Sequence, residues 1–193
     1  MTSPRDGVRS RPAGAGPSGS GRTLLLAYGA ATAALTLAAT LYVRVPGPGA
    51  GQYFNLGEAV IYTAALLAGP WVGASGAVGA ALADLLLGGA AWAPWTLVVK
   101  AVEGALVGWL AGRGPSEGRR WGRDLAAIVP GALWMMAGYA LAAWVLLGPG
   151  AVPPELVIDG LQTATSAAVA LVLAPALRAA VRRGGRGVTA LPG

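Results

Sequence analysis

Residues 51–112 form a long, almost wholly apolar stretch that nevertheless holds four ionisable side chains. These are Glu58, Asp84, Lys100 and Glu103. A charged side chain on a helix at the centre of a bilayer costs about 3 kcal/mol or more. Four of them in consecutive apolar segments therefore indicate a polar site inside a membrane protein.

The composition of the whole chain agrees with this interpretation. Hydrophobic residues make up 55% of the chain and charged residues 11%, whereas a soluble domain carries about 25% charged residues. The 31 glycines suit membrane helices, whose backbones approach closely where side chains are small. We therefore expect an all-α integral membrane bundle.

Several classes of chemistry are excluded by residue types that the chain lacks. It contains no cysteine and no histidine, which removes disulfides, thiol nucleophiles, the usual zinc sites, histidine-ligated haem and a Ser–His–Asp triad. Its one lysine, Lys100, is not preceded by glycine, so the phosphate-binding loop of a P-loop ATPase is absent. We expect neither an enzyme nor a resident cofactor or metal.

Apolar runs separated by proline and glycine predict six membrane helices. Between them they make one domain over residues 22–183, and the proline- and glycine-containing segment 44–57 is expected to be a loop. Residues 1–21 are rich in Pro, Gly, Ser and Arg and predict a disordered cytoplasmic tail. Residues 184–193 predict a flexible C-terminal tail. The expected helices cover residues 22–43, 58–68, 70–87, 93–111, 125–147 and 153–181.

The arginines set the orientation of these six helices. They gather in the N-terminal tail, after the fourth helix and at the end of the sixth, and only Arg44 falls on the other side. Positive residues are enriched in cytoplasmic loops, so both termini are expected in the cytoplasm. This distribution also explains the net charge of +6 without a nucleic-acid partner.

In this orientation, polar residues from several helices converge in the outer half of the bundle. On the fourth helix, Thr96, Lys100 and Glu103 share one face, and Lys100 is able to pair with Glu103 or Asp84. The last helix carries a polar stripe of Asp159, Gln162, Thr163 and Ser166, and Tyr139 lies in the outer half of the fifth. An uptake protein would capture its solute there.

Each of these residues also has a structural explanation. Lys100 and Glu103 can form an internal ion pair that holds helices in register. Glu58 suits the first turn of a helix, and Asp84 suits a helix end at the membrane interface. Trp92 and Trp95 serve either as interfacial anchors or as a stacking wall. The stripe beginning at Asp159 is harder to explain structurally, because several polar groups on one face need partners.

Five short motifs in order resemble the S components of energy-coupling factor (ECF) transporters. The second helix opens with Asn-Leu-Gly-Glu at 55–58 and closes with Leu-Ala-Gly-Pro at 67–70. A G-x-x-x-A-D-L-L segment follows at 79–86, then W-A-P-x-T at 92–96 and K-x-x-x-G at 100–104. The length, the six expected spans and the cytoplasmic termini are also similar to this family.

The resemblance implies a vitamin-capture subunit in the cytoplasmic membrane of a prokaryote. Such subunits bind a vitamin or precursor at the outer face and dock on a transmembrane coupling (T) subunit that carries two ABC-type ATPases. Small residues on the first helix, Ala27 and Ala31, are the candidate docking surface. Candidate pocket residues, with Glu58 and Asp84 added from the buried charges, are Tyr53, Asn55, Trp92, Trp95, Lys100, Glu103, Tyr139, Asp159, Gln162 and Thr163.

The substrate and two other functional classes stay open on the sequence. The aromatic residues favour a flavin- or pyrimidine-like ring, such as riboflavin or a thiamine precursor, whereas an unpaired Lys100 would suit the carboxylate of pantothenate or biotin. A stand-alone carrier or channel would also tolerate buried charges. A membrane-embedded enzyme would need acids clustered toward the cytoplasm, where this chain has few.

Overall fold

The structure is a computed structural model that describes residues 19–47, 51–112 and 121–188. The rest of the two expected tails, residues 1–18 and 189–193, lies outside the described residues, as does most of the basic segment after the fourth helix. Within the described part, helices account for almost the whole chain, which confirms the expected helical class.

The helices follow the predicted order. They are α1 (Gly19–Tyr42), α2 (Gly57–Ala68), α3 (Pro70–Leu86), α4 (Ala93–Ala111), α5 (Trp121–Leu147) and α6 (Val152–Val188), with a short 3₁₀ turn η1 (Pro149–Ala151) before α6. The segment expected to be a loop contains two short strands, β1 (Arg44–Pro46) and β2 (Tyr53–Asn55).

The two strands pair as a small antiparallel hairpin. Arg44 lies opposite Asn55, and Pro46 lies opposite Tyr53. Proline is tolerated here because both strands are edges of a two-stranded ribbon, so no ladder bond is lost in a sheet interior. Proline and glycine excluded a helix, as predicted, but they did not reveal the pairing.

Three helix boundaries differ by more than one residue from those expected from the sequence. Helix α1 begins at Gly19 and α5 at Trp121, three and four residues earlier than predicted, and α6 continues to Val188. The end of α6 is rich in arginine, which is a good helix former, so low hydrophobicity does not stop the helix. Pro175 lies inside α6 without ending it.

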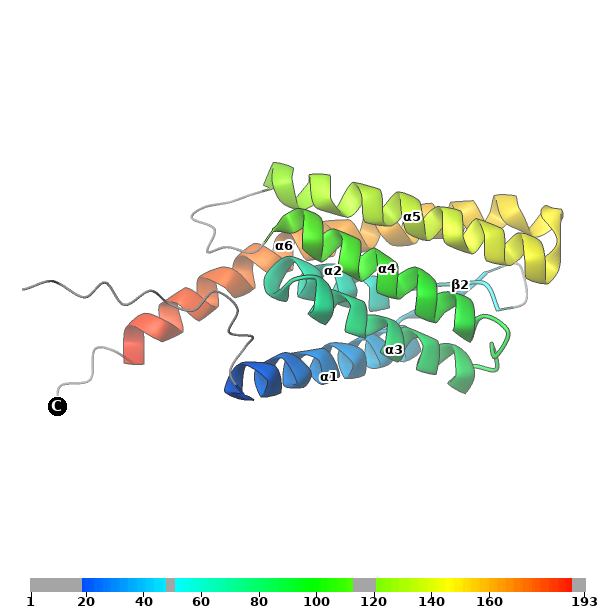
Figure 1. Cartoon of the computed structure of the whole chain (residues 1–193). Helices are drawn as coiled ribbons and strands as arrows, with labels where there is room; N and C mark the ends of the chain where they lie inside the picture. Colours follow the sequence, from blue (N-terminus) through cyan, green and yellow to red (C-terminus); the bar gives the residue numbers. More distant parts are fainter. Residues whose placement is uncertain (1–18, 48–50, 113–120, 189–193) are drawn as a thin grey trace, which may run out of the picture.

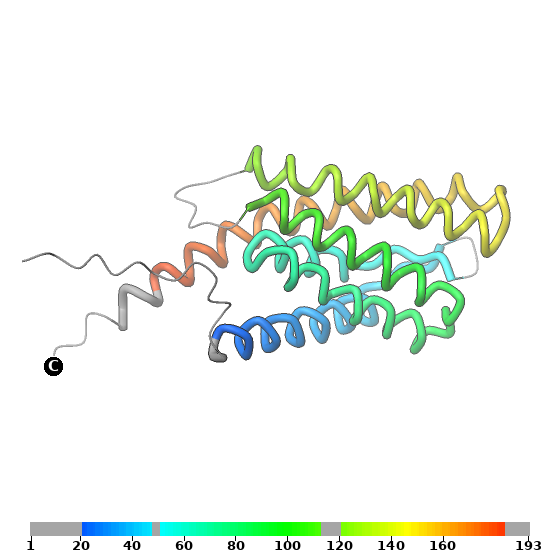
Figure 2. The backbone as a smooth tube through the Cα atoms, in the orientation of Figure 1, coloured from blue at the N-terminus to red at the C-terminus, as the bar shows by residue number. Residues whose placement is uncertain are grey.

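The six helices run alternately up and down (Figure 1). The hairpin, the α3–α4 connection and η1 lie together at one end of the bundle, here called the hairpin end. The first turns of α1 and the last turns of α6 lie at the opposite, terminal end, where α6 extends past its neighbours (Figure 2). Residues that begin α2, α4 and α6 therefore meet residues that end α3 and α5.

Within the described residues, three helical segments are long and apolar enough, by length and composition, to cross a membrane. They are Gly21–Tyr42, Trp121–Leu147 and Pro149–Arg183. Helices α2 and α3 are apolar but shorter, because the Gly69–Pro70 step divides them. Gly69 has a φ of 88°, a backbone conformation open to glycine at little cost, and it turns the chain between these two helices.

Close backbone packing joins α3 to α1 and to α4. A Cβ atom added to Gly79 would overlap the carbonyl oxygen of Ala33 in α1. One added to Gly104 would lie 2.5 Å from the carbonyl oxygen of Gly73, so α3 and α4 touch through two glycines. Such contacts between small residues are typical of membrane helix pairs.

Replacing Gly79 with alanine should therefore destabilise the bundle. Overpacking of this kind costs about 2 kcal/mol, so we expect a midpoint of thermal unfolding in detergent about 4 to 8 °C lower. Gly122→Ala is the matched control, since a Cβ atom there meets nothing within 4 Å. Equal unfolding temperatures for the two variants would contradict the close α1–α3 contact.

Candidate functional site

A buried ion-pair triad lies in the hairpin half of the bundle. Lys100 of α4 places its Nζ atom 2.8 Å from Oε2 of Glu58 and 3.0 Å from Oε2 of Glu103. The Lys100 side chain is 5% exposed, and both carboxylates are fully buried. Charges buried this deeply persist only when they are paired and hydrogen-bonded. Removing the three groups of the triad from water therefore costs free energy that their mutual contacts must offset.

Neighbouring side chains complete the coordination of both carboxylates. Gln162 donates from Nε2 to Oε2 of Glu58 at 2.7 Å, and Thr163 donates to Oε1 of the same residue at 3.2 Å. The Tyr62 hydroxyl donates to Oε1 of Glu103 at 2.8 Å. The polar stripe of α6 thus faces the opening turn of α2, as its spacing on one helix face requires.

The hairpin is fastened to α6 by two amide side chains. Both the backbone nitrogen and Nδ2 of Asn55 donate to Oε1 of Gln162 at 2.8 Å. Gln52 donates from Nε2 to the carbonyl oxygen of Ala151 at 3.1 Å. Asn55 also accepts from the backbone nitrogen of Gly57, the first residue of α2, at 2.9 Å. Gln162 therefore links hairpin and triad.

Tyr53 joins the hairpin to α3. The Tyr53 hydroxyl donates to Oδ1 of Asp84. Burial, followed by the charge of Asp84, raises the pKa of Tyr53 above its ordinary value, so the hydroxyl stays protonated and remains a donor. The Arg44 guanidinium lies 5.7 Å from the centre of the Tyr53 ring, which places one cation at the rim of the site.

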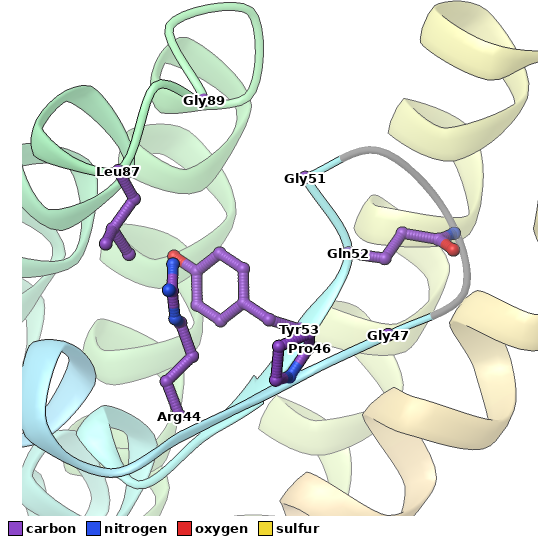
Figure 3. A pocket seen from close by; sticks show the side chains of 8 residues that line it. All are labelled: Arg44, Pro46, Gly47, Gly51, Gln52, Tyr53, Leu87 and Gly89. Carbon is purple, nitrogen blue, oxygen red and sulfur yellow. The ribbon is translucent and has the colours of Figure 1, made fainter.

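A cavity of about 190 Å³ opens beside these residues. Figure 3 shows Arg44, Tyr53 and Leu87 lining the same space, while the Gln52 side chain points to the other side of the hairpin. Pockets that hold drug-sized ligands measure about 300 to 1,000 Å³. The cavity is therefore too small for a whole vitamin with the hairpin in this position.

Aromatic side chains form one wall of the triad. The Tyr139 hydroxyl lies 3.0 Å from Oγ1 of Thr96, and Nζ of Lys100 lies 5.5 Å from the centre of the Tyr139 ring. The Trp92 ring is 6.4 Å from that of Tyr139 at an interplanar angle of 39°. Trp95 is half-buried and packs against this cluster. The tryptophans thus adjoin the polar site, which favours a stacking wall over isolated anchors.

The structure brings the sequence-predicted residues together with one change of partner. Glu103 pairs with Lys100 as expected, but the second acid on Lys100 is Glu58, and no ion pair in the described residues joins Lys100 to Asp84. Asp84 comes from the far end of α3 and bonds to Tyr53 instead. Helix periodicity could not decide this, because the partners lie on different helices.

Sequence reasoning missed Gln52, Tyr62 and Glu155. Glu155 lies one turn before Asp159 on the buried face of α6, and both are nearly inaccessible, at 6% and 3% exposure. Their i, i+4 spacing was the available signal. Ala27 and Ala31, the candidate docking residues on α1, are exposed.

The charges of the site leave acceptors in excess of donors. Lys100 is shared between two carboxylates, and it is the one lysine of the chain. Several buried oxygens have no hydrogen-bond partner among the described residues, including Oδ2 of Asp84, Oε2 of Glu155, Oδ2 of Asp159 and Oε1 of Gln52. Such a site is suited to a neutral or cationic ligand rich in donors and disfavours a carboxylate.

The terminal end is closed by a different set of contacts. Arg178 of α6 donates to Oδ2 of Asp124 at 2.7 Å and to the carbonyl oxygen of Leu66 at 2.8 Å, which ties together α6, α5 and the end of α2. An apolar cluster that includes Tyr62, Val107 and Ile128 packs across α2, α4 and α5. The polar site thus opens toward the hairpin end.

Arg178→Ala should loosen the terminal end while sparing the polar site. Asp124 is buried, and removing its partner costs about 2 kcal/mol, so we expect unfolding about 4 to 8 °C lower in detergent. Ligand affinity should change less than twofold, because Arg178 bonds to Asp124 and Leu66, which both lie outside the hairpin. A tenfold loss of affinity in the folded variant would show that the two ends are coupled.

Comparison with known proteins decides the family. A model of the family described as "ECF-type riboflavin transporter, S component" matches residues 22–179, which include every helix that contributes to the site. The chain belongs to this family. S components are membrane subunits that capture vitamins, so the buried polar site lies in a transport protein, as the sequence motifs predicted.

One relative of this S component comes from Pyrococcus woesei. It is 42% identical over 124 residues, which cover 64% of this chain and 80% of the relative, and is described as "Uncharacterized protein in gap 3'region". The description states no ligand. The choice of substrate within the family therefore depends on the site of this chain.

Proposed function

We propose that this S component captures riboflavin at the hairpin end of the bundle and delivers it to an ATP-driven uptake complex. The observation that carries the proposal is the saturation of Lys100 by Glu58 and Glu103. Because the one lysine of the chain is neutralised, the site favours an uncharged ring over the carboxylates of pantothenate and biotin. The riboflavin description of the family model supports the same choice.

The aromatic wall and the unpartnered oxygens suit the two parts of such a ligand. Trp92 and Tyr139 offer ring faces beside the triad, and aromatic stacking is favourable with offset or tilted geometry. The unpartnered oxygen of Asp84 accepts a hydrogen bond from the polar edge of the ring. A thiamine-like pyrimidine meets the same requirements and is the second candidate substrate.

Ligand entry requires the hairpin to move. The cavity of about 190 Å³ is smaller than a flavin-sized pocket, and Asn55 and Gln52 hold the hairpin against α6. Breaking these few neutral hydrogen bonds costs less than breaking the triad, since each contributes about 1 kcal/mol. The hairpin is thus the gate of the site.

The membrane arrangement proposed is six spans with both termini in the cytoplasm of a prokaryotic cell. The first turns of α1 and the last turns of α6 lie at the same end of the bundle, which supports an even number of crossings. Arginine near that end follows the positive-inside rule, so the hairpin end faces outward. A T subunit docks on α1 through Ala27 and Ala31, and two ABC-type ATPases supply the energy.

The proposal is tested by the ligand that the protein carries. Absorbance and mass spectra of material released from the detergent-purified protein should identify riboflavin. If thiamine or its pyrimidine precursor is released instead, the proposed capture function holds and the proposed substrate is wrong. Protein that carries no ligand, and binds none from a panel of vitamins, would instead support the alternative of a stand-alone carrier.

A further inference from the structure

A cluster of buried acceptors at the start of α6 lies beyond the ion-pair triad. Glu155 and Asp159 are one helical turn apart, and Gln52 reaches Glu155 from the hairpin. The three side chains are 6%, 3% and 4% exposed. Each has an oxygen atom that is buried and has no hydrogen-bond partner within the described residues, namely Oε2, Oδ2 and Oε1 respectively.

The surroundings of the cluster offer few donors to these atoms. The Gln52 amide bonds to the carbonyl oxygen of Ala151 and lies against Glu155. Lys100 is already bonded to Glu58 and Glu103, and Arg44 lies beside Tyr53 at the rim. An unpartnered buried acceptor costs about 1 to 3 kcal/mol, so three together point to donors that come from a bound molecule.

We propose that Glu155 and Asp159 recognise a polyhydroxyl side chain of the ligand by accepting hydrogen bonds from its hydroxyl groups. A hydroxyl is a neutral donor that places no further negative charge beside two carboxyl groups. Gln52 contributes its amide oxygen from the hairpin. Hydroxyls that bond to Gln52 and to the two acids at the same time also hold the hairpin against α6. The inference rests on the proposed function, since riboflavin carries such a chain on its ring.

The cluster adjoins the aromatic wall but belongs to a different element. Trp92, just before α4, and Tyr139 of α5 adjoin the triad, whereas Glu155 and Asp159 belong to the first turns of α6 under the hairpin. A ring on the aromatic wall and a chain directed toward α6 would occupy the two regions together. Glu155 and Asp159 are then specificity residues for the chain, and the wall binds the ring.

Two flavins that differ only in the chain test the assignment. Lumiflavin has the riboflavin ring with a methyl group in place of the polyhydroxyl chain. We expect the wild-type protein to bind riboflavin at least about tenfold more tightly than lumiflavin. Asp159→Ala and Glu155→Ala should each weaken the binding of riboflavin about tenfold and leave the binding of lumiflavin unchanged. The ratio of the two affinities then approaches one.

The controls distinguish a specificity role from a structural one. Thr165→Ala changes an exposed residue of the same helix and should keep the wild-type ratio. Where an alanine variant does not fold, Asp159→Leu carries the same ratio test, because leucine has a similar branched shape and no acceptor. Equal losses of affinity for both flavins, or no change in either affinity, would overturn the assignment while leaving riboflavin capture intact. Absence of binding of either flavin to the wild-type protein would overturn the proposed function itself.

Discussion

Lys100→Met is expected to lower the midpoint of thermal unfolding in detergent by about 10 °C. The variant leaves Glu58 and Glu103 facing each other in full burial, without the ammonium group that bonds to both. Breaking a buried ion pair by removing one partner costs about 3 to 5 kcal/mol, and each kcal/mol corresponds to about 2 to 4 °C for a chain of this size. Riboflavin retention should fall with the folded fraction.

Two further variants distinguish the effect of the unpaired carboxylates from the effect of losing the lysine side chain. Glu103→Gln keeps the hydrogen bond from Tyr62 and leaves Lys100 and Glu58 as a neutral pair, so we expect less than about 1 kcal/mol of destabilisation. Adding Glu58→Gln and Glu103→Gln to Lys100→Met removes all three charges and should recover part of the stability. Unfolding of Lys100→Met at the wild-type temperature would show that the triad is not a buried charge cluster.

Locking the hairpin to α6 is expected to abolish ligand entry. A Cβ atom at Gly47 would lie 2.5 Å from Cδ1 of Ile158, so these two positions are neighbours where the hairpin meets α6 and are chosen for an engineered disulfide. The chain has no native cysteine, so Gly47→Cys combined with Ile158→Cys can form only this bond within one chain. The oxidised protein should bind riboflavin at least about 100-fold more slowly, because the cavity with the hairpin in place is smaller than a flavin pocket.

Reduction provides the internal control for the locked hairpin. Binding should return when the disulfide is reduced, and each single-cysteine variant should bind as the reduced double variant does. Equal binding rates for the oxidised and reduced forms would mean that the ligand enters by another route, for example between α4 and α5. The comparison uses one protein sample in two redox states, so expression and folding differences do not enter.

Much of the fold could be predicted from helix patterns alone. Proline and glycine placed the breaks, so α2, α3 and α4 begin within a residue of the expected positions. The starts of α1 and α5 and the end of α6 were misplaced, because these segments have few apolar residues. Arginine and glycine near a helix terminus do not distinguish a helix from a loop. The β1–β2 hairpin was missed for a similar reason, since two strands of three residues have no readable alternation.

That these polar residues lie together was predictable from the sequence, but their pairing was not. Buried charges on an apolar background identified Glu58, Lys100 and Glu103, and one-face spacing identified the stripe of α6. Which acid pairs with Lys100 depends on how α2 and α4 lie against each other, and a single sequence does not contain that information. Glu155 was overlooked because an acid at the first turn of a helix has an ordinary explanation in the helix dipole.

The most direct test of the account is an equilibrium titration of the ligand-stripped protein with riboflavin. Binding is followed by quenching of flavin fluorescence, with pantothenate and biotin as carboxylate competitors. The account predicts saturable binding of one riboflavin per chain that neither carboxylate displaces, because Lys100 is already neutralised within the triad. Tight binding of a carboxylate vitamin, with none of riboflavin, would show that a cation of the site, Lys100 or Arg44, binds the ligand and would contradict the account.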